Sequence, residues 1–142
     1  MKKKLVYICS PCKGHDGNRE HNIIMAQEYC RQTMTLFPDV IPLAPHVYFT
    51  QFFDDSDAAE RKLCMDAGID LMLRCQEVWV FGIKNPSEGM KKEIELARKV
   101  GIPVVDACDI FGTKQTAAPA ADAVAQYADN PATAATPLNY GA

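Results

Sequence analysis

The segment 87–99 contains three glutamates at helical spacing, and one of them differs from the others. Glu88 and Glu95 each precede a lysine by four residues, an order that favours exposed ion pairs on a helix surface. Such pairs need no role beyond stabilising the helix. Glu93 has no basic residue three or four positions away on its own segment. We therefore treat Glu93 as the first candidate for chemistry.

Small residues flank Glu93 at the distance of one helical turn. At 100° per residue it lies at the edge of the face formed by Met90, Ile94 and Ala97, which we expect to pack on a sheet. Gly89, four residues earlier, leaves space for a ligand beside the carboxylate. Burial would raise the pKa of Glu93 and the helix N-terminus would lower it, so the direction of the net pKa shift stays open. The alternative is a glutamate at the helix boundary that reaches into water.

Cysteine and histidine offer two other kinds of chemistry. The sequence Cys9-Ser-Pro-Cys12 at the end of an apolar run could form a redox dithiol, but two loop thiols without a redox partner are the interpretation we favour. Zinc would require further ligands at paired spacing, and none is found around the three histidines or Cys30. We expect no metal and no cofactor.

Apolar runs and helical patterns alternate along residues 1–112. We expect strands at 5–9, 40–44, 77–82 and 102–105, and helices at 18–36, 57–75 and 87–100. This order predicts an α/β fold: a doubly wound, Rossmann-like or flavodoxin-like parallel sheet of four to five strands with helices on both faces. Ligands of such sheets bind at the carboxyl ends of the strands, here in loops 10–17, 45–55 and 83–89.

The composition changes near residue 113. Residues 113–142 contain 11 alanines, 4 threonines and 3 prolines, too little bulky apolar surface to form a core. We expect one domain over residues 1–112 and an Ala/Pro/Thr-rich C-terminal tail over 113–142.

Charge and hydropathy exclude several classes of protein. With 15 basic and 18 acidic side chains among 142 residues, the formal charge of −3 argues against general nucleic-acid binding. No apolar run approaches the roughly 20 residues of a membrane span. The apolar stretch after Lys4 ends at Ser10 and is too short for an export signal. We therefore expect a cytoplasmic protein with no nucleic-acid or membrane partner.

Two segments resemble the nucleoside 2-deoxyribosyltransferase superfamily, which includes 2′-deoxynucleoside 5′-monophosphate N-glycosidases and uncharacterised bacterial and phage relatives. Residues 6–10, Val-Tyr-Ile-Cys-Ser, are similar to the first strand and substrate loop of that superfamily. The pattern Ser87-x-Gly89-x-x-x-Glu93, followed by Ala97 and by Gly-Ile-Pro-Val at 101–104, is similar to its catalytic helix. The order of elements extends the resemblance over residues 4–106.

The resemblance implies that Glu93 is a catalytic nucleophile. It would attack C1′ of a (deoxy)ribosyl group and form a covalent glycosyl-enzyme. Water would then complete an N-glycosidase reaction, and a second base would complete a transferase reaction. The expected substrate-binding residues are Tyr7, Ser10, Ser87, Gly89, Asp70 and His46, the last of which lies in the loop 45–55. A serine at position 87 favours a 5′-monophosphate and hydrolysis.

The sequence also departs from the superfamily pattern. Asp66 and Asp70 straddle the place of its usual aspartate, and Pro-Cys-Lys at 11–13 replaces a Gly- and Arg-rich turn, for which Lys13 or Arg19 could substitute. Two other functions stay open: a non-catalytic nucleotide-binding or sensor module on the same fold, and a thiol redox protein. The resemblance further implies a homo-oligomer, a dimer or higher, with a small-molecule nucleoside or nucleotide as ligand.

Overall fold

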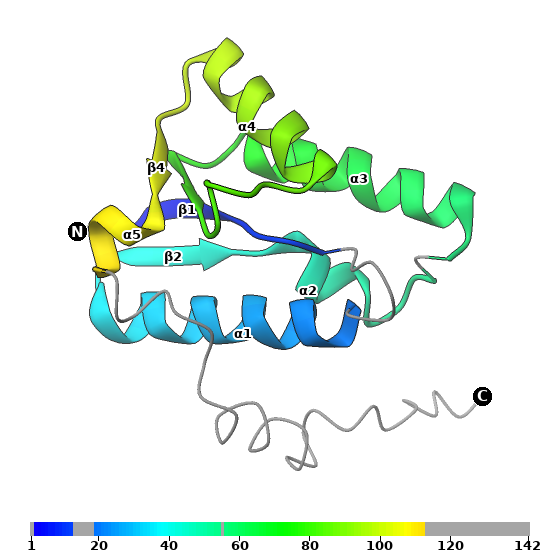
Figure 1. The fold of residues 1–142 in the computed structure, drawn as a ribbon, viewed down its shortest axis with the longest axis horizontal. Coiled ribbons are helices and arrows are strands. Elements are labelled where there is room, and N and C mark those ends of the chain that lie inside the picture. The colour runs from blue at the N-terminus through cyan, green and yellow to red at the C-terminus, as the bar shows by residue number, and fades with distance from the viewer. Residues whose placement is uncertain (1, 13–18, 55, 113–142) are drawn as a thin grey trace.

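The computed structural model describes residues 2–12, 19–54 and 56–112, which form a parallel sheet with helices on both faces (Figure 1). The 4-stranded sheet has the order β2-β1-β3-β4 and all three strand pairs are parallel. The strands are β1 (Lys4–Cys9), β2 (Val40–Leu43), β3 (Glu77–Val80) and β4 (Val104–Asp106). The predicted doubly wound α/β fold is confirmed. The expected tail, 113–142, lies outside the described residues.

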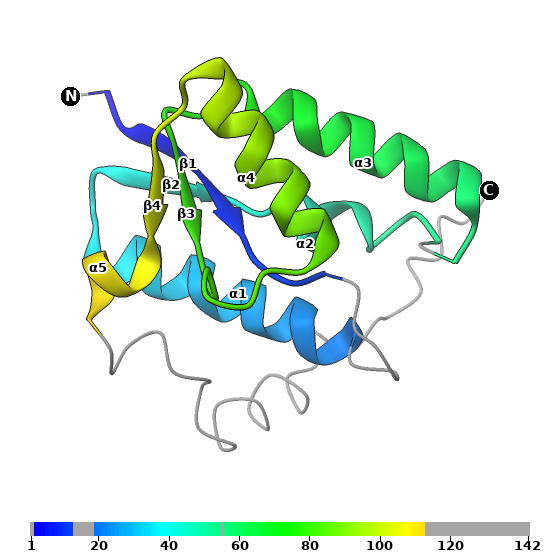
Figure 2. The ribbon, with the colours of Figure 1, turned by 45° about the horizontal axis from the view of Figure 1, so that its top comes forward.

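Two layers of helices enclose the sheet. Helices α1 and α5 lie on one face, and α3 and α4 lie on the other (Figures 1 and 2). The short α2 follows β2 and contacts both α1 and α3 at the carboxyl end of the sheet. The helices are α1 (Arg19–Leu36), α2 (Pro45–Phe49), α3 (Ala58–Met72), α4 (Glu88–Val100) and α5 (Ala107–Phe111).

Alternation along β1 distributes its side chains between two cores. Val6 and Ile8 pack in the core beneath α1 and α5, whereas Tyr7 and Cys9 pack in the core beneath α3 and α4. Successive residues of a strand point to opposite faces, so a continuous apolar run is what a doubly covered strand requires. This alternation places Tyr7 and Cys9 on the same side of the sheet as α4.

Helix α1 buries part of the face that its sequence predicts, because Ala26 is buried and Cys30 packs against the core. The spacing of Ile23, Ala26, Cys30 and Met34 indicated a stripe that includes Met34, but that side chain is 60% exposed. The buried face also contains Tyr29, whose ring stacks on Phe81 with centroids 4.0 Å apart. This aromatic pair adds to the apolar area that α1 buries against the sheet.

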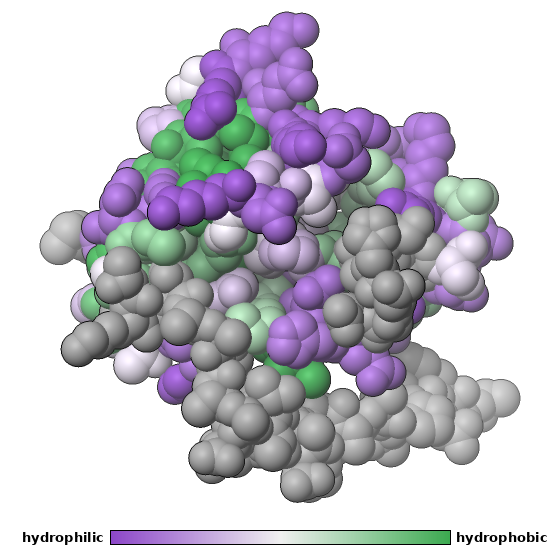
Figure 3. Space-filling view, in the orientation of Figure 1, coloured by the Kyte–Doolittle hydropathy of each residue, from purple (hydrophilic) through white to green (hydrophobic). Residues whose placement is uncertain are grey.

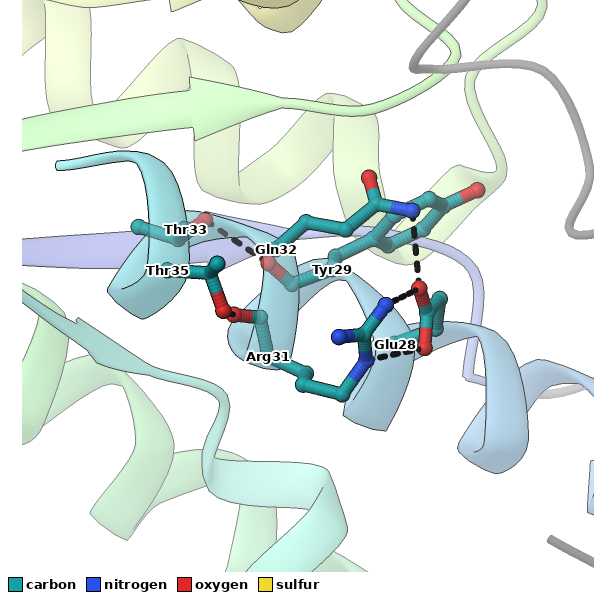
Figure 4. Close-up of polar contacts among 6 residues, drawn as sticks. All are labelled: Glu28, Tyr29, Arg31, Gln32, Thr33 and Thr35. Atoms are coloured by element: carbon teal, nitrogen blue, oxygen red, sulfur yellow. Dashed lines mark hydrogen bonds and ion pairs between the residues drawn. The ribbon is translucent and has the colours of Figure 1, made fainter. Parts of the chain in front are cut away.

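A buried carboxylate on α1 is paired and hydrogen-bonded within its own helix (Figure 4). Glu28 accepts hydrogen bonds from Arg31 Nε at 2.9 Å and Arg31 Nη2 at 2.7 Å, and from Gln32 Nε2 at 2.9 Å. A buried charge is tolerated when it is paired and hydrogen-bonded in this way. Glu28 therefore has a structural explanation.

Helix α4 begins and ends as its sequence indicates. Ser87 Oγ accepts a hydrogen bond from the backbone amide of Met90 at 3.3 Å, and Gly101 ends the helix at φ 85°. The predicted sheet-packing face, Met90, Ile94 and Ala97, is buried. The exposed pairing differs from the predicted one, because Glu88 binds Lys91 at 2.9 Å rather than Lys92. An exposed glutamate on a helix can pair with a lysine three or four residues later. The difference in stability between these two ion pairs is small.

Two short helices occupy segments without a predicted helix. Residues 45–49, expected to be an aromatic-rich loop, form α2, with Pro45 in the first turn where a missing N–H costs nothing. Helix α5 begins after Asp106, whose side chain accepts a hydrogen bond from the amide of Cys108 at 3.0 Å. Each helix follows a strand directly.

One face of the molecule is mainly hydrophilic over α3 and α4, with hydrophobic side chains gathered between β4 and α4 (Figure 3). The partly buried Ile102 and Val104 pack against the core beneath α4. Strand β4 is the last strand of the described sheet, which leaves its outer side less covered. No helix in the described ranges has both the length and the apolar character needed to cross a bilayer.

Candidate functional site

A cavity of about 480 Å³ opens at the carboxyl end of the sheet. Its residues come from the end of β1, from α2 and the turn after it, from α3, and from the first turns of α4. The cavity includes six of the residues expected from the sequence, from three separate segments: Tyr7, Ser10, His46, Ser87, Gly89 and Glu93. Elements far apart in the sequence therefore bring these predicted side chains together.

Glu93 is partly buried and interacts with two donors from β1. The Tyr7 hydroxyl and the Cys9 thiol each donate a hydrogen bond to its carboxylate. Tyr7 and Cys9 are 4% and 0% exposed, so neither donor can turn freely into solvent. The two bonds hold a carboxylate that lines the cavity.

Burial dominates the electrostatics of this group. It raises the pKa of Glu93 to about 7, although the hydrogen bonds from Cys9 and Tyr7 act in the lowering direction. Burial and the neighbouring Glu93 carboxylate also raise the pKa of the Tyr7 hydroxyl and of the Cys9 thiol. Tyr7 and Cys9 therefore stay protonated as donors near neutral pH, while Glu93 changes its charge there.

A buried hydroxyl and a glycine line the same cavity as Glu93. Ser10 is 6% exposed, and its hydroxyl has no hydrogen-bond partner among the described residues. A buried hydroxyl in that condition costs free energy unless a ligand or water satisfies it. Gly89 adds room, because a Cβ built at this position would meet no atom within 4 Å. Ser10 and Gly89 thus provide a polar contact and space beside the carboxylate.

Asp70 lies away from the cavity. Its side chain is exposed on α3 and is not among the residues that line the cavity. Asp66, the other residue near that place in the pattern, is bound to Lys62 at 2.8 Å on the outer surface of α3. The structure therefore does not bring Asp70 to Glu93.

A second carboxylate does lie at the cavity, but it is exposed. Glu88 is the other carboxylate that lines the described part, and its side chain is 84% exposed and paired with Lys91. An exposed, ion-paired glutamate is ionised at neutral pH and has no proton to donate. The hydrogen bond from Lys91 lowers the pKa of Glu88 further. Glu88 is thus a weak candidate for a general acid.

The cysteine motif after β1 has the wrong environment for a redox dithiol. A reactive cysteine needs an accessible thiol of lowered pKa, whereas Cys9 is fully buried and its pKa is raised. Cys12 lines the cavity. Within residues 2–12, 19–54 and 56–112, no cluster of three or more histidine, cysteine or acidic side chains is arranged to hold a metal ion.

Helix α2, the turn after it and α3 form one wall of the cavity, and the α3 part of this wall was not predicted from the sequence. Phe49 and Phe53 contribute aromatic surface, Met65 contributes apolar surface, and Arg61 contributes a guanidinium. Arg61, Met65 and Ile69 follow one another at four-residue spacing along α3, the signal of a shared helix face. That spacing was available in the sequence, but it did not show which face would border a ligand.

A family model described as Domain of unknown function (DUF7768) matches residues 4–107. The chain belongs to this family. The matched range runs from the first residue of β1 to the first residue of α5 and so includes the whole described sheet and the helix that carries Glu93. Comparison with curated proteins and with solved structures finds no match.

Proposed function

We propose that this chain cleaves or transfers the N-glycosidic bond of a (deoxy)nucleoside or a nucleoside 5′-monophosphate, with Glu93 as the nucleophile. The single observation that carries the proposal is the partly buried Glu93 carboxylate, which is held by Tyr7 and Cys9 and lines the cavity. Carboxylates that attack a sugar carbon need orientation and partial desolvation, and both are present around Glu93.

The proposed reaction has two steps. Glu93 Oε attacks C1′, the C1′–N bond breaks, and the electron pair leaves with the base, which takes a proton from solvent. Water then attacks C1′ of the glycosyl-enzyme, gives its proton to solvent and restores the carboxylate. In a transferase a second base attacks in place of water. The ionised form of Glu93 is required for the first step, so the raised pKa makes activity depend on pH near neutrality.

A nucleoside 5′-monophosphate is the substrate class we favour. Ser87 and Gly89 lie at the start of α4, and the unpartnered Ser10 hydroxyl lies in the same cavity. Amides at a helix N-terminus and nearby hydroxyls attract an anion. Small-molecule binding at this edge also fits the general location of ligands in parallel α/β sheets.

A second candidate function is a nucleotide-binding or sensor module without turnover. The exposed state of Glu88 favours it, because the described part of the cavity offers no buried second carboxylate to protonate a leaving base. Such a protein would bind a nucleotide in the same cavity and release it unchanged.

The test is base release, measured by liquid chromatography, from a panel of deoxynucleosides and deoxynucleoside 5′-monophosphates with and without a second free base. Glu93→Gln serves as the matched control because it keeps size and hydrogen-bonding shape. Release or exchange by the wild type, absent from the control, supports the proposal. A nucleotide that raises the Tm without any release supports the binding module instead. If no nucleotide is cleaved and none raises the Tm, both functions are contradicted.

The cytoplasmic location and the homo-oligomeric state expected from the sequence belong to the same proposal. Both can be measured on the full chain, by cell fractionation and by light scattering coupled to size exclusion. An exported protein would contradict the first expectation, and a monomer at micromolar concentration would contradict the second.

A further inference from the structure

One of the basic side chains that line the cavity is an arginine. Arg61, in the first turns of α3, is half-buried and is one of the cavity residues. Its guanidinium forms no ion pair or hydrogen bond with any other side chain in the part of the chain that the structure describes. Its neighbour Lys62, by contrast, is exposed and bound to Asp66 at 2.8 Å. A guanidinium that is half-removed from water and unpaired is suited to contact a ligand with acceptor atoms.

Aromatic side chains lie on the same wall of the cavity. Tyr48, Phe49, Phe52 and Phe53 contact one another through ring pairs with centroids 5.1 to 6.0 Å apart, and we call them the aromatic cluster. Two members, Phe49 and Phe53, line the cavity together with Arg61. Flat heteroaromatic rings stack on such side chains, and an arginine beside them can bind the edge of the same ring.

We infer that Arg61 is a specificity-determining residue that selects a 6-oxopurine base, whose edge carries two acceptors. The fork of an arginine matches the O6 and N7 acceptors of hypoxanthine or guanine in a bidentate contact. Adenine presents an amino donor at the 6-position, which the guanidinium would oppose. The inference rests on the proposed function, because the base must lie toward α2 and α3 when C1′ lies at Glu93.

The same contact assists the leaving group. When the C1′–N9 bond breaks, the electron pair spreads over the purine ring and reaches O6 and N7. A guanidinium at these atoms stabilises that charge before solvent protonates the base. Arg61 would thereby reduce the need for a general acid, a role for which Glu88 is poorly placed by its exposure.

The experiment compares 2′-deoxyinosine and 2′-deoxyadenosine 5′-monophosphates, which present an acceptor and a donor at the 6-position. We would measure kcat/KM for base release by the wild type, by Arg61→Gln and by Arg61→Lys. Lys62→Gln is the matched control, since it makes the same change one residue away and outside the cavity. Tm values verify that all variants fold.

The wild type is expected to prefer deoxyinosine monophosphate. Arg61→Gln should lower kcat/KM for this substrate by about 10- to 100-fold, the effect of losing one bidentate base contact, and should change deoxyadenosine monophosphate much less. Arg61→Lys should recover only part of the loss because it lacks the planar fork. Lys62→Gln should match the wild type.

Three results overturn the inference and leave the proposed function standing. They are an unchanged ratio between the two substrates in Arg61→Gln, an equal loss for both, and a wild type that cleaves only pyrimidine nucleotides. Absence of base release by the wild type from every nucleotide is a different result, since it removes the proposed function and the role of Arg61 with it.

Discussion

The hydroxyl of Tyr7 donates a hydrogen bond to the carboxylate of Glu93 and so connects an inner strand of the sheet to helix α4. The donor belongs to β1 and is fixed by the core, whereas the acceptor belongs to a helix that packs against the same core through Met90 and Ile94. The position of the carboxylate is therefore set by the packing of the fold.

Tyr7→Phe is expected to shift the pH dependence of activity to higher pH. The bond from Tyr7 lowers the pKa of Glu93 from what burial alone would produce, so removing the hydroxyl raises that pKa. Because the ionised form reacts, the rising limb of kcat/KM should move from near pH 7 upward by about one unit, the size of one hydrogen bond to a charge.

Cys9→Ala offers an independent check of the same relationship. Its thiol is the other donor to Glu93, and its loss should move the rising limb in the same direction. The control is Cys108→Ala, at an exposed position outside the cavity. A profile that stays unchanged in both Tyr7→Phe and Cys9→Ala would show that these donors do not act on Glu93.

Glu93→Gln is expected to stabilise the protein at neutral pH and above. The pKa of Glu93 is raised from 4.5 to about 7, so the folded state holds a proton between these values that the unfolded state has released. The wild type consequently loses stability as pH rises from about 4.5 to about 7, and the variant avoids that loss.

The measurement is the free energy of unfolding from urea titrations between pH 4 and pH 8. The difference between Glu93→Gln and the wild type should be small at the acidic end and should increase across the interval. Glu95→Gln, an exposed position on the same helix, should show a flat difference. A flat difference for Glu93→Gln as well would mean that the carboxylate is not desolvated in the folded protein.

Two substitutions at Ser87 separate its capping role from substrate binding. Ser87→Ala removes the acceptor for the Met90 amide and should cost about 1 kcal/mol of stability. Ser87→Asp keeps a good cap but adds negative charge at the start of α4. If a 5′-phosphate binds there, Ser87→Asp should raise KM for monophosphates at least tenfold and change KM for nucleosides little. Equal effects on both substrate classes would place the phosphate elsewhere.

Gly89→Ala is expected to retain or increase stability while it lowers activity. A Cβ at this position meets no atom within 4 Å, and alanine favours a helix over glycine by up to about 1 kcal/mol. The added methyl group projects beside Glu93 into space that we assign to the sugar. Gly89→Val should lower activity further. Full activity in both variants, at unchanged Tm, would exclude a sugar at this position.

The parallel sheet and the α4 site could be predicted because each has a local signal. The apolar run at β1 specified a doubly covered strand, and Ser87 and Gly101 marked the ends of α4. The spacing of Met90, Ile94 and Ala97 identified the buried face, which placed Glu93 at its edge. These features depend on residues within one element, so the sequence contains them directly.

Other features depend on contacts between elements and could not be predicted from spacing. The stacking of Tyr29 on Phe81 and the exposure of Met34 both depend on how α1 lies against the sheet. The direction of the Glu93 pKa shift depends on whether burial, which raises the pKa, outweighs the hydrogen bonds from β1, which lower it. Arg61 became a candidate only when α3 was placed beside α2. The placement of α3 also leaves Asp70 exposed to solvent and outside the cavity.

The most direct measurement of the central role of Glu93 is peptide mapping of the protein quenched by acid during turnover of a deoxynucleoside monophosphate. A mass increase equal to one glycosyl group, located on the peptide that contains Glu93 and absent in Glu93→Gln, is the expected result. Turnover without any adduct on that peptide, or an adduct on Glu88 or Glu95, would contradict the assignment of Glu93 as the nucleophile.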